Sequence, residues 1–226
     1  MDLRFGFDVG RKFNEDGSVR FWPGNTMICL LDHNTEVFSR IKIIRDNFVR
    51  NKIGECITPL PDISLHMTAI EGVVDGNRSQ DHWTTLLPTD ALLSDVDDFF
   101  QEKWNEIPPM GKVEMVFHHI RVGTGLCVAL HPKTEDDEKR IRGWREIVSK
   151  KMGLRFPSFE TYEFHISLAY GYRVPNKEHR MDNLENIVNE YNDEFAKDKF
   201  SFVVPEPSMT YFDNMFFFSK ERIPRY

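Results

Sequence analysis

Short apolar runs that are typical of strands alternate along the chain with segments whose apolar residues recur at helical spacing. One helix is predicted between an N-capping Thr35 and a terminating Gly54, and another between Thr134 and Gly153. The other predicted elements are helices from about residue 89 and at residues 177–195, strands at residues 27–31, 63–70, 112–120, 126–130, 163–170, 199–204 and 209–218, and a hairpin at residues 12–21. This mixture predicts an α+β fold.

Four features of the first half of the chain recur in the second half at a constant separation of 99 residues. The pairs are a helix cap, a helix stop and two positions of an H-x-[T/S] motif: Thr35 and Thr134, Gly54 and Gly153, His66 and His165, Thr68 and Ser167. Coincidence among common cap residues is the alternative explanation. A duplication predicts two pseudo-symmetric lobes, each an α-β-α-β unit, with antiparallel sheets flanking a central cleft. Residues 1–226 then form a single two-lobed domain, with one motif near residues 63–70 and the other near 163–170.

Composition narrows the class of protein. The 226 residues carry a formal net charge of −7, whereas proteins of long duplex nucleic acid are usually basic. No apolar run approaches the roughly 20 residues of a membrane helix, so no membrane association is predicted. The three cysteines are scattered, which favours a reducing, cytoplasmic location over a disulfide framework.

The H-x-[T/S] pattern occurs four times among the eight histidines, at His33, His66, His82 and His165. His33 and His82 lie in polar segments, DHNTE and SQDHWTT, that have no strand alternation. His66 and His165 lie within the apolar runs SLHMTAI and EFHISLA. Of these four histidines, His66 and His165 are therefore the two predicted to project from strands.

Residues i and i+2 of a strand share one face, so His66 lies beside Thr68 and His165 beside Ser167. Two imidazoles on opposite sides of a phosphodiester suit in-line displacement, because one accepts a proton from the nucleophile and the other donates to the leaving oxygen. The hydroxyls are suited to bind non-bridging phosphate oxygens. The alternative is a pair of structural histidines, each hydrogen-bonded within its sheet.

No metal or other cofactor is predicted. His118 and His119 are adjacent in a predicted strand, so their side chains are expected on opposite faces, where they do not chelate one ion together.

The paired motifs resemble those of the two-histidine phosphoesterase superfamily, and the segments FWPGNT, SLHMTAIEGV and HISLAYGY are similar to a poorly characterised branch of it. This resemblance covers most of the chain. It implies a catalytic quartet of His66, Thr68, His165 and Ser167. Two departures stand out: Ser167 replaces the commoner threonine but keeps the hydroxyl, and Tyr170 stands where RNA ligase-like members often carry arginine.

Four further residues are candidates for substrate binding, each with a structural alternative. Asn25 follows a Pro-Gly turn, and Arg78 lies in a short loop after the first motif. Tyr170 and Tyr172 end the second motif strand, where ideal alternation places them opposite His165 unless a bulge re-aims them.

These observations predict a hydrolase of phosphoric diester bonds that opens a 2′,3′-cyclic phosphate or a related nucleotide or RNA-end phosphodiester without a metal. A small nucleotide or RNA end is the expected partner, and the pattern carries no indication of oligomeric state. The alternatives are a phosphodiesterase of a signalling cyclic or 2′-5′ oligonucleotide, and a nucleotide-binding module without turnover.

Overall fold

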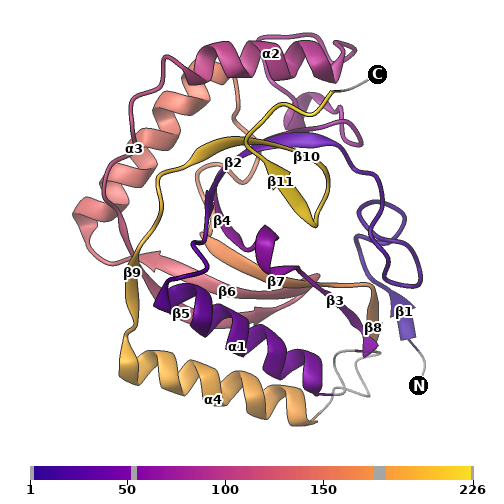
Figure 1. Ribbon diagram of the computed structural model, residues 1–226, viewed down its shortest axis with the longest axis vertical. Coiled ribbons are helices and arrows are strands. Elements are labelled where there is room, and N and C mark those ends of the chain that lie inside the picture. The colour runs from indigo at the N-terminus through magenta and orange to yellow at the C-terminus, as the bar shows by residue number, and fades with distance from the viewer. Residues whose placement is uncertain (1–2, 52–54, 176–181, 225–226) are drawn as a thin grey trace.

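The computed structural model describes residues 3–51, 55–175 and 182–224, in which four α-helices surround a curled sheet (Figure 1). The helices are α1 (Glu36–Arg50), α2 (Leu93–Trp104), α3 (Glu135–Met152) and α4 (Asp182–Asp198). The strands are β1 (Leu3–Phe5), β2 (Gly24–Leu30), β3 (Ile57–Pro59), β4 (His66–Val74), β5 (Glu114–Val122), β6 (Gly125–Pro132), β7 (His165–Gly171), β8 (Arg173–Pro175), β9 (Ser201–Val203), β10 (Ser208–Asn214) and β11 (Phe217–Ser219).

The main sheet joins the two halves of the chain. Its order is β11-β10-β2-β4-β7-β6-β5-β9, and β3 also pairs with β7. Each of these strand pairs is antiparallel. Strands β4 and β7, which carry the two histidine motifs, meet at its centre. Strands β1 and β8 form a separate antiparallel pair.

Helices from each half cover the sheet of the other half. Helix α1 follows β2 but packs against β3 and β7, whereas α3 follows β6 and packs against both β6 and β4. Helix α4 lies beside α1, where Asn47 donates a hydrogen bond to the Tyr191 hydroxyl at 3.0 Å (Figure 1). Helices α2 and α3 meet through an edge-to-face contact of Trp104 and Trp144. The predicted α+β fold with two pseudo-symmetric lobes is confirmed.

The predicted helix caps explain where the crossing helices begin and end. The Thr35 hydroxyl accepts from the backbone N–H of Phe38, and the Thr134 hydroxyl accepts from that of Asp137 at 3.1 Å. Gly153 ends α3 with φ of +68°, a left-handed conformation that favours glycine. The proposed stop of the first helix, Gly54, lies outside the described residues.

One of two local predictions was wrong. Helix α2 begins at Leu93 rather than near residue 89. Residues 12–21 reverse direction around Asp16 and Gly17, as predicted. Phe13 pairs with Val19 in an antiparallel bridge, and the Arg20 N–H donates to the carbonyl oxygen of Lys12 at 2.8 Å.

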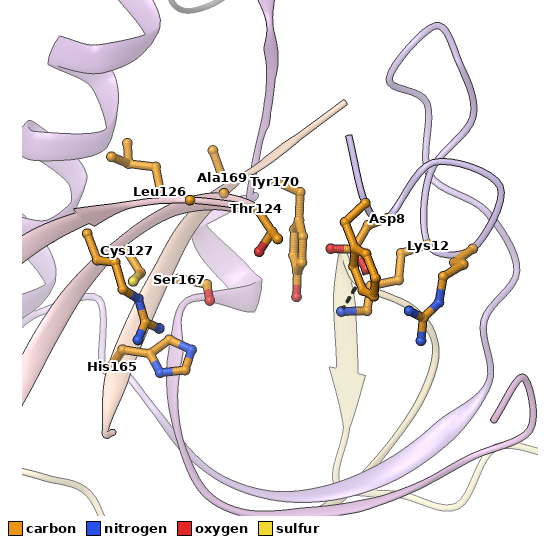
Figure 2. A pocket seen from close by; sticks show the side chains of 14 residues that line it. Asp8, Lys12, Thr124, Leu126, Cys127, His165, Ser167, Ala169 and Tyr170 are labelled. Carbon is orange, nitrogen blue, oxygen red and sulfur yellow. Dashed lines mark ion pairs between the residues drawn. The ribbon is translucent and has the colours of Figure 1, made fainter. Parts of the chain in front are cut away.

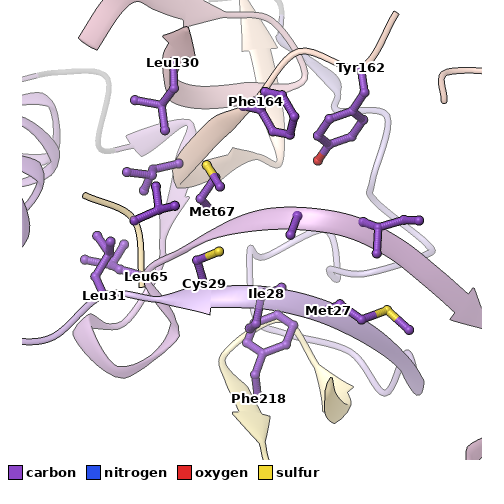
Figure 3. Packing of buried hydrophobic residues seen from close by; sticks show 14 of the residues in the cluster. Met27, Ile28, Cys29, Leu31, Leu65, Met67, Leu130, Tyr162, Phe164 and Phe218 are labelled. Carbon is purple, nitrogen blue, oxygen red and sulfur yellow. The ribbon is translucent and has the colours of Figure 1, made fainter. Parts of the chain in front are cut away.

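The core explains which way the motif side chains point. Met67 of β4 and Ile166 of β7 are both fully buried, and Met67 packs among apolar side chains of β2 and β7 (Figure 3). Because side chains alternate along a strand, burial of this face turns the histidines and hydroxyls of the motifs to the other face. No helix in the described part of the chain has the length and apolar character needed to cross a bilayer.

Candidate active site

The pairing of β4 with β7 brings the two motifs together. Met67 pairs with Ile166 in antiparallel register. Continued by one residue each way, this register sets Thr68 opposite His165 and His66 opposite Ser167. All four side chains line one cavity of about 310 Å³. The structure therefore gathers the complete predicted quartet.

Both histidines are held by the same backbone contact. Nδ1 of His66 lies 2.6 Å from the carbonyl oxygen of Ser64, and Nδ1 of His165 lies 2.8 Å from that of Glu163. A carbonyl oxygen only accepts, so each Nδ1 carries a hydrogen and each neutral ring keeps its lone pair on Nε2. Each imidazole is thus oriented to exchange a proton through Nε2.

Burial shifts the protonation of both rings in the same direction. It lowers the pKa of His66 to about 4, and the neighbouring His165 adds to this shift. Burial also lowers the pKa of His165, aided by the positive charges of Arg121 and Lys12 and opposed by the Glu163 carbonyl. Both imidazoles are therefore neutral in the free protein at pH 7.

Aromatic side chains enclose the motif. The ring of Phe218 in β11 meets the His66 imidazole edge-on at 4.6 Å. The Tyr162 hydroxyl is hydrogen-bonded to Thr68, and the buried guanidinium of Arg145 lies 4.5 Å from the Tyr162 ring centroid. Burial raises the pKa of Tyr162, so its hydroxyl stays protonated. These contacts position both members of the first motif.

Tyr170 faces the motif because of a β-bulge. The register of β7 against β6 shifts between Ser167 and Ala169, which breaks the ideal alternation that predicted Tyr170 on the opposite face. Tyr170 consequently lines the cavity together with His165, and Figure 2 shows its ring directed into the same space as His165 and Ser167. Lys12 lies on the other side of this ring, with Nζ 4.8 Å from the ring centroid.

Comparisons with known proteins place the chain in a family. The family 2H-phosphodiest, described as a domain of unknown function (DUF1868), matches residues 12–125. This match spans half of the chain and includes the first motif. The chain belongs to the two-histidine (2H) phosphodiesterase family.

A solved structure shares the fold over most of the chain. A conserved protein of unknown function, ATU0111 from Agrobacterium tumefaciens, is 25% identical with a TM-score of 0.85, covering 95% of this chain and 91% of its own. Usb1 from Kluyveromyces marxianus is more distant, at 14% identity and a TM-score of 0.43, covering 86% of this chain and 95% of its own. A structure of the same Usb1 with uridine monophosphate is 10% identical with a TM-score of 0.43, covering 89% and 96%. No curated protein matches the chain.

The other candidate residues of this 2H protein have partners within the fold. Asn25 borders the cavity, but it is buried, donates to the Asp97 carboxylate at 2.8 Å and accepts from the Val73 N–H at 3.1 Å. These bonds join β2, β4 and α2, which gives Asn25 a structural task.

Arg78 and Tyr172 are not among the described residues that line the cavity. The Arg78 guanidinium donates to the carbonyl oxygens of Thr89 and Ala91, both at 2.7 Å. The Tyr172 hydroxyl donates to the carbonyl oxygen of Glu55 at 2.7 Å. The structure therefore brings neither residue to the predicted quartet.

The two excluded H-x-[T/S] histidines differ in position. His33 stacks on Phe38 at the start of α1, away from the cavity. His82 lies at the cavity wall, with its ring 5.6 Å from that of Phe156. Sequence context alone did not reveal this position, because the polar segment between β4 and α2 reaches the cavity wall only in the folded chain.

The prediction that the side chains of His118 and His119 point to opposite faces of the strand was wrong. Their Nδ1 atoms lie 2.7 Å apart, because the register of β5 shifts between Phe117 and His119 and removes the strict alternation. His131 stacks on His118 at 3.8 Å. In the part of the chain that the structure describes, no group of three or more His, Cys, Asp or Glu side chains is arranged to hold a metal ion.

Residues that sequence reasoning missed line the other side of His165. Arg11, Lys12 and Arg121 border a second cavity, of about 290 Å³. It shares Arg11, Lys12, His165, Ser167 and Tyr170 with the first cavity, whereas Arg121 borders the second one. Lys12 is the first residue of the predicted hairpin, and Arg11 directly precedes it. Arg121 reaches the cleft because β5 pairs with β6 and β6 pairs with β7 in a register that aligns Arg121, Cys127 and Ser167. No local sequence pattern contains this register.

Proposed function

We propose that residues 1–226 act as a single two-lobed, metal-independent phosphodiesterase that opens a 2′,3′-cyclic phosphate or a related nucleotide or RNA-end phosphodiester. The observation that carries this proposal is the matched placement of His66 and His165, each hydrogen-bonded through Nδ1 to the residue two positions earlier. Membership of the 2H family supports the reaction class. Two histidines with a purely structural role would not need matched hydrogen bonds at the wall of one cavity.

In the proposed reaction, Nε2 of His66 takes a proton from water as the water oxygen attacks phosphorus. Nε2 of His165 gives its proton to the leaving ribose oxygen as the P–O bond breaks. His66 serves as the base because its pKa lies near 4, well below the ordinary value, so it remains neutral while its partner is protonated. Exchange of protons with solvent restores the starting state.

The hydroxyls complete the proposed site. Thr68 and Ser167 stand beside the opposite motif's histidine and are placed to donate to the two non-bridging oxygens, where negative charge grows during displacement. The Tyr162 hydroxyl, bonded to Thr68, orients that donor. A substrate that is already anionic also raises the pKa of a neighbouring imidazole, which favours the protonated acid in the bound complex.

The walls of the larger cavity suit a nucleoside. Its aromatic and apolar lining provides surfaces on which a base stacks, while the quartet holds the phosphate. These residues are Trp22, Phe156, Tyr162, Tyr170, Phe212, Met215 and Phe218.

Chromatographic assay of a substrate panel tests the proposal. The panel contains the four nucleoside 2′,3′-cyclic phosphates, an oligoribonucleotide ending in a 2′,3′-cyclic phosphate, 3′,5′-cyclic nucleotides and 2′-5′ oligoadenylate. We expect turnover of the 2′,3′-cyclic group to a single monophosphate isomer. Selective turnover of the 3′,5′-cyclic or 2′-5′ compounds would show instead that the substrate is a signalling nucleotide. Tight binding without any product would make the protein a binding module.

A further inference from the structure

The second cavity is cationic although the chain as a whole is acidic. Three of its lining residues, Arg11, Lys12 and Arg121, are basic, and a single one, Asp8, is acidic. The net charge of the chain is −7, so this concentration of positive charge is local.

The guanidinium of Arg11 is held by aromatic rings alone. It lies 4.8 Å from the Phe7 ring centroid and 5.2 Å from that of Trp22. Among the described residues it makes no ion pair and no hydrogen bond. A guanidinium that is fixed by stacking keeps its N–H donors free, which is the arrangement that suits recognition of a phosphate.

The other two cations are each balanced in part. Lys12 forms an ion pair with Asp8 at 3.3 Å, and the pKa of Lys12 lies above its ordinary value because Tyr170 and Asp8 outweigh the effect of burial. Arg121 donates to Glu163 at 2.6 Å. Both stay charged, and one net positive charge remains on the wall even when both carboxylates are counted.

The second cavity continues directly from the proposed reaction centre. Ser167 pairs with Cys127, and Cys127 pairs with Arg121, so the three side chains follow one row across β7, β6 and β5. The small side chain of Cys127 in the middle of this row does not fill the space between Ser167 and Arg121. Arg11, Lys12, His165, Ser167 and Tyr170 line both cavities, so the two are continuous, and Arg121 extends the positive charge into the second one. Figure 2 shows His165, Ser167, Tyr170 and Lys12 around the second cavity.

We propose that this second cavity is a subsite for a further phosphate group of the substrate, bound by Arg11, Lys12 and Arg121. The inference rests on the proposed function, because it assigns the scissile phosphate to the quartet and a second phosphate to the cations. It narrows the substrate to nucleotides with at least two phosphates, such as a terminally phosphorylated nucleotide or an RNA end with its preceding phosphodiester.

Calorimetric titration with product-like ligands tests the subsite without turnover. Adenosine 3′-phosphate is compared with adenosine 3′,5′-bisphosphate and with the dinucleotide ApAp. We expect at least one of the two-phosphate ligands to bind the parent about tenfold or more tightly, the effect of one or two charge-assisted hydrogen bonds. Arg121→Gln and Lys12→Met should each bring this affinity ratio to within about twofold of one.

Matched controls separate the subsite from general charge effects. Lys42→Met removes a lysine of α1 that pairs with Asp62. Arg155→Gln removes an arginine that pairs with Glu146. Both should retain the parent ratio. A ratio near one in the parent, or one that survives Arg121→Gln and Lys12→Met, would overturn the subsite. If the subsite is overturned in this way while 2′,3′-cyclic phosphates are hydrolysed, the proposed function holds without the subsite. If the parent prefers the two-phosphate ligands as expected but turns over no 2′,3′-cyclic phosphate, the proposed function is refuted.

Discussion

Met67 and Ile166 pair across β4 and β7 and are both fully buried. This single register places two motifs that lie 99 residues apart on one surface, with each histidine opposite the hydroxyl of the other motif. The proposed reaction centre therefore depends on a pair of core residues to which the proposal assigns no chemical step.

Loss of either histidine should abolish most of the activity. One general acid or base contributes about 10²–10⁴-fold to a rate. His66→Ala and His165→Ala should each lower kcat by about this factor while KM changes much less, as steady-state kinetics on the 2′,3′-cyclic substrate will measure. Because both groups act in one displacement, the double variant should lose less than the product of the two single losses.

His33→Ala is the matched control, since His33 carries the same short motif but stacks on Phe38 outside the cavity. Its kcat should stay within about threefold of the parent. Folded His66→Ala and His165→Ala proteins with parental turnover would disprove the two-histidine mechanism.

The pH dependence should reflect two depressed imidazole pKa values. The active form carries one proton on the pair, and burial lowers the pKa of both His66 and His165. The profile of kcat/KM should therefore be bell-shaped with its maximum below pH 6.5, falling on the alkaline side as the acid loses its proton. His66→Ala should lose the acidic limb and His165→Ala the alkaline limb. An optimum above pH 7.5 would contradict this assignment.

The hydroxyl donors should matter for rate rather than for binding. Removing one donor to a developing oxyanion costs about 10²–10³-fold in kcat. Ser167→Ala and Thr68→Val should show losses in this range. Ser167→Thr and Thr68→Ser keep the hydroxyl and should retain most of the activity. Equal kinetics for the hydroxyl-free and hydroxyl-bearing variants would exclude the phosphate contact.

Activity should persist after metal removal, because the proposed proton transfers use imidazoles alone. Dialysis against EDTA should leave kcat within about twofold of its starting value, since no step is assigned to a Lewis acid. Loss of turnover that added zinc or magnesium restores would refute the mechanism.

Asn25 should act on stability rather than on chemistry. Its buried amide joins Asp97 and Val73, and loss of two such bonds costs about 2 kcal/mol or more. Asn25→Ala should shift the midpoint of urea unfolding to lower concentration, while the folded protein keeps its kcat. If Asn25→Ala leaves the stability unchanged but raises KM, Asn25 binds substrate instead.

Local features of the fold were accessible from the sequence. Thr35 and Thr134 cap their helices and Gly153 ends α3 as predicted, because capping depends on a few neighbouring atoms. Apolar alternation also placed His66 and His165 on strands. The 99-residue repetition then predicted two lobes around one cleft.

The tertiary structure decided everything that depends on pairing between distant strands. Bulges in β7 and β5 turned Tyr170 toward the cavity and brought His118 onto His119, against strict alternation. The second cavity arises only where the turn that holds Lys12 meets the strand that holds Arg121. Alternation and capping are set by neighbours along the chain, whereas register, bulges and converging charges are set by packing between segments that the sequence keeps far apart.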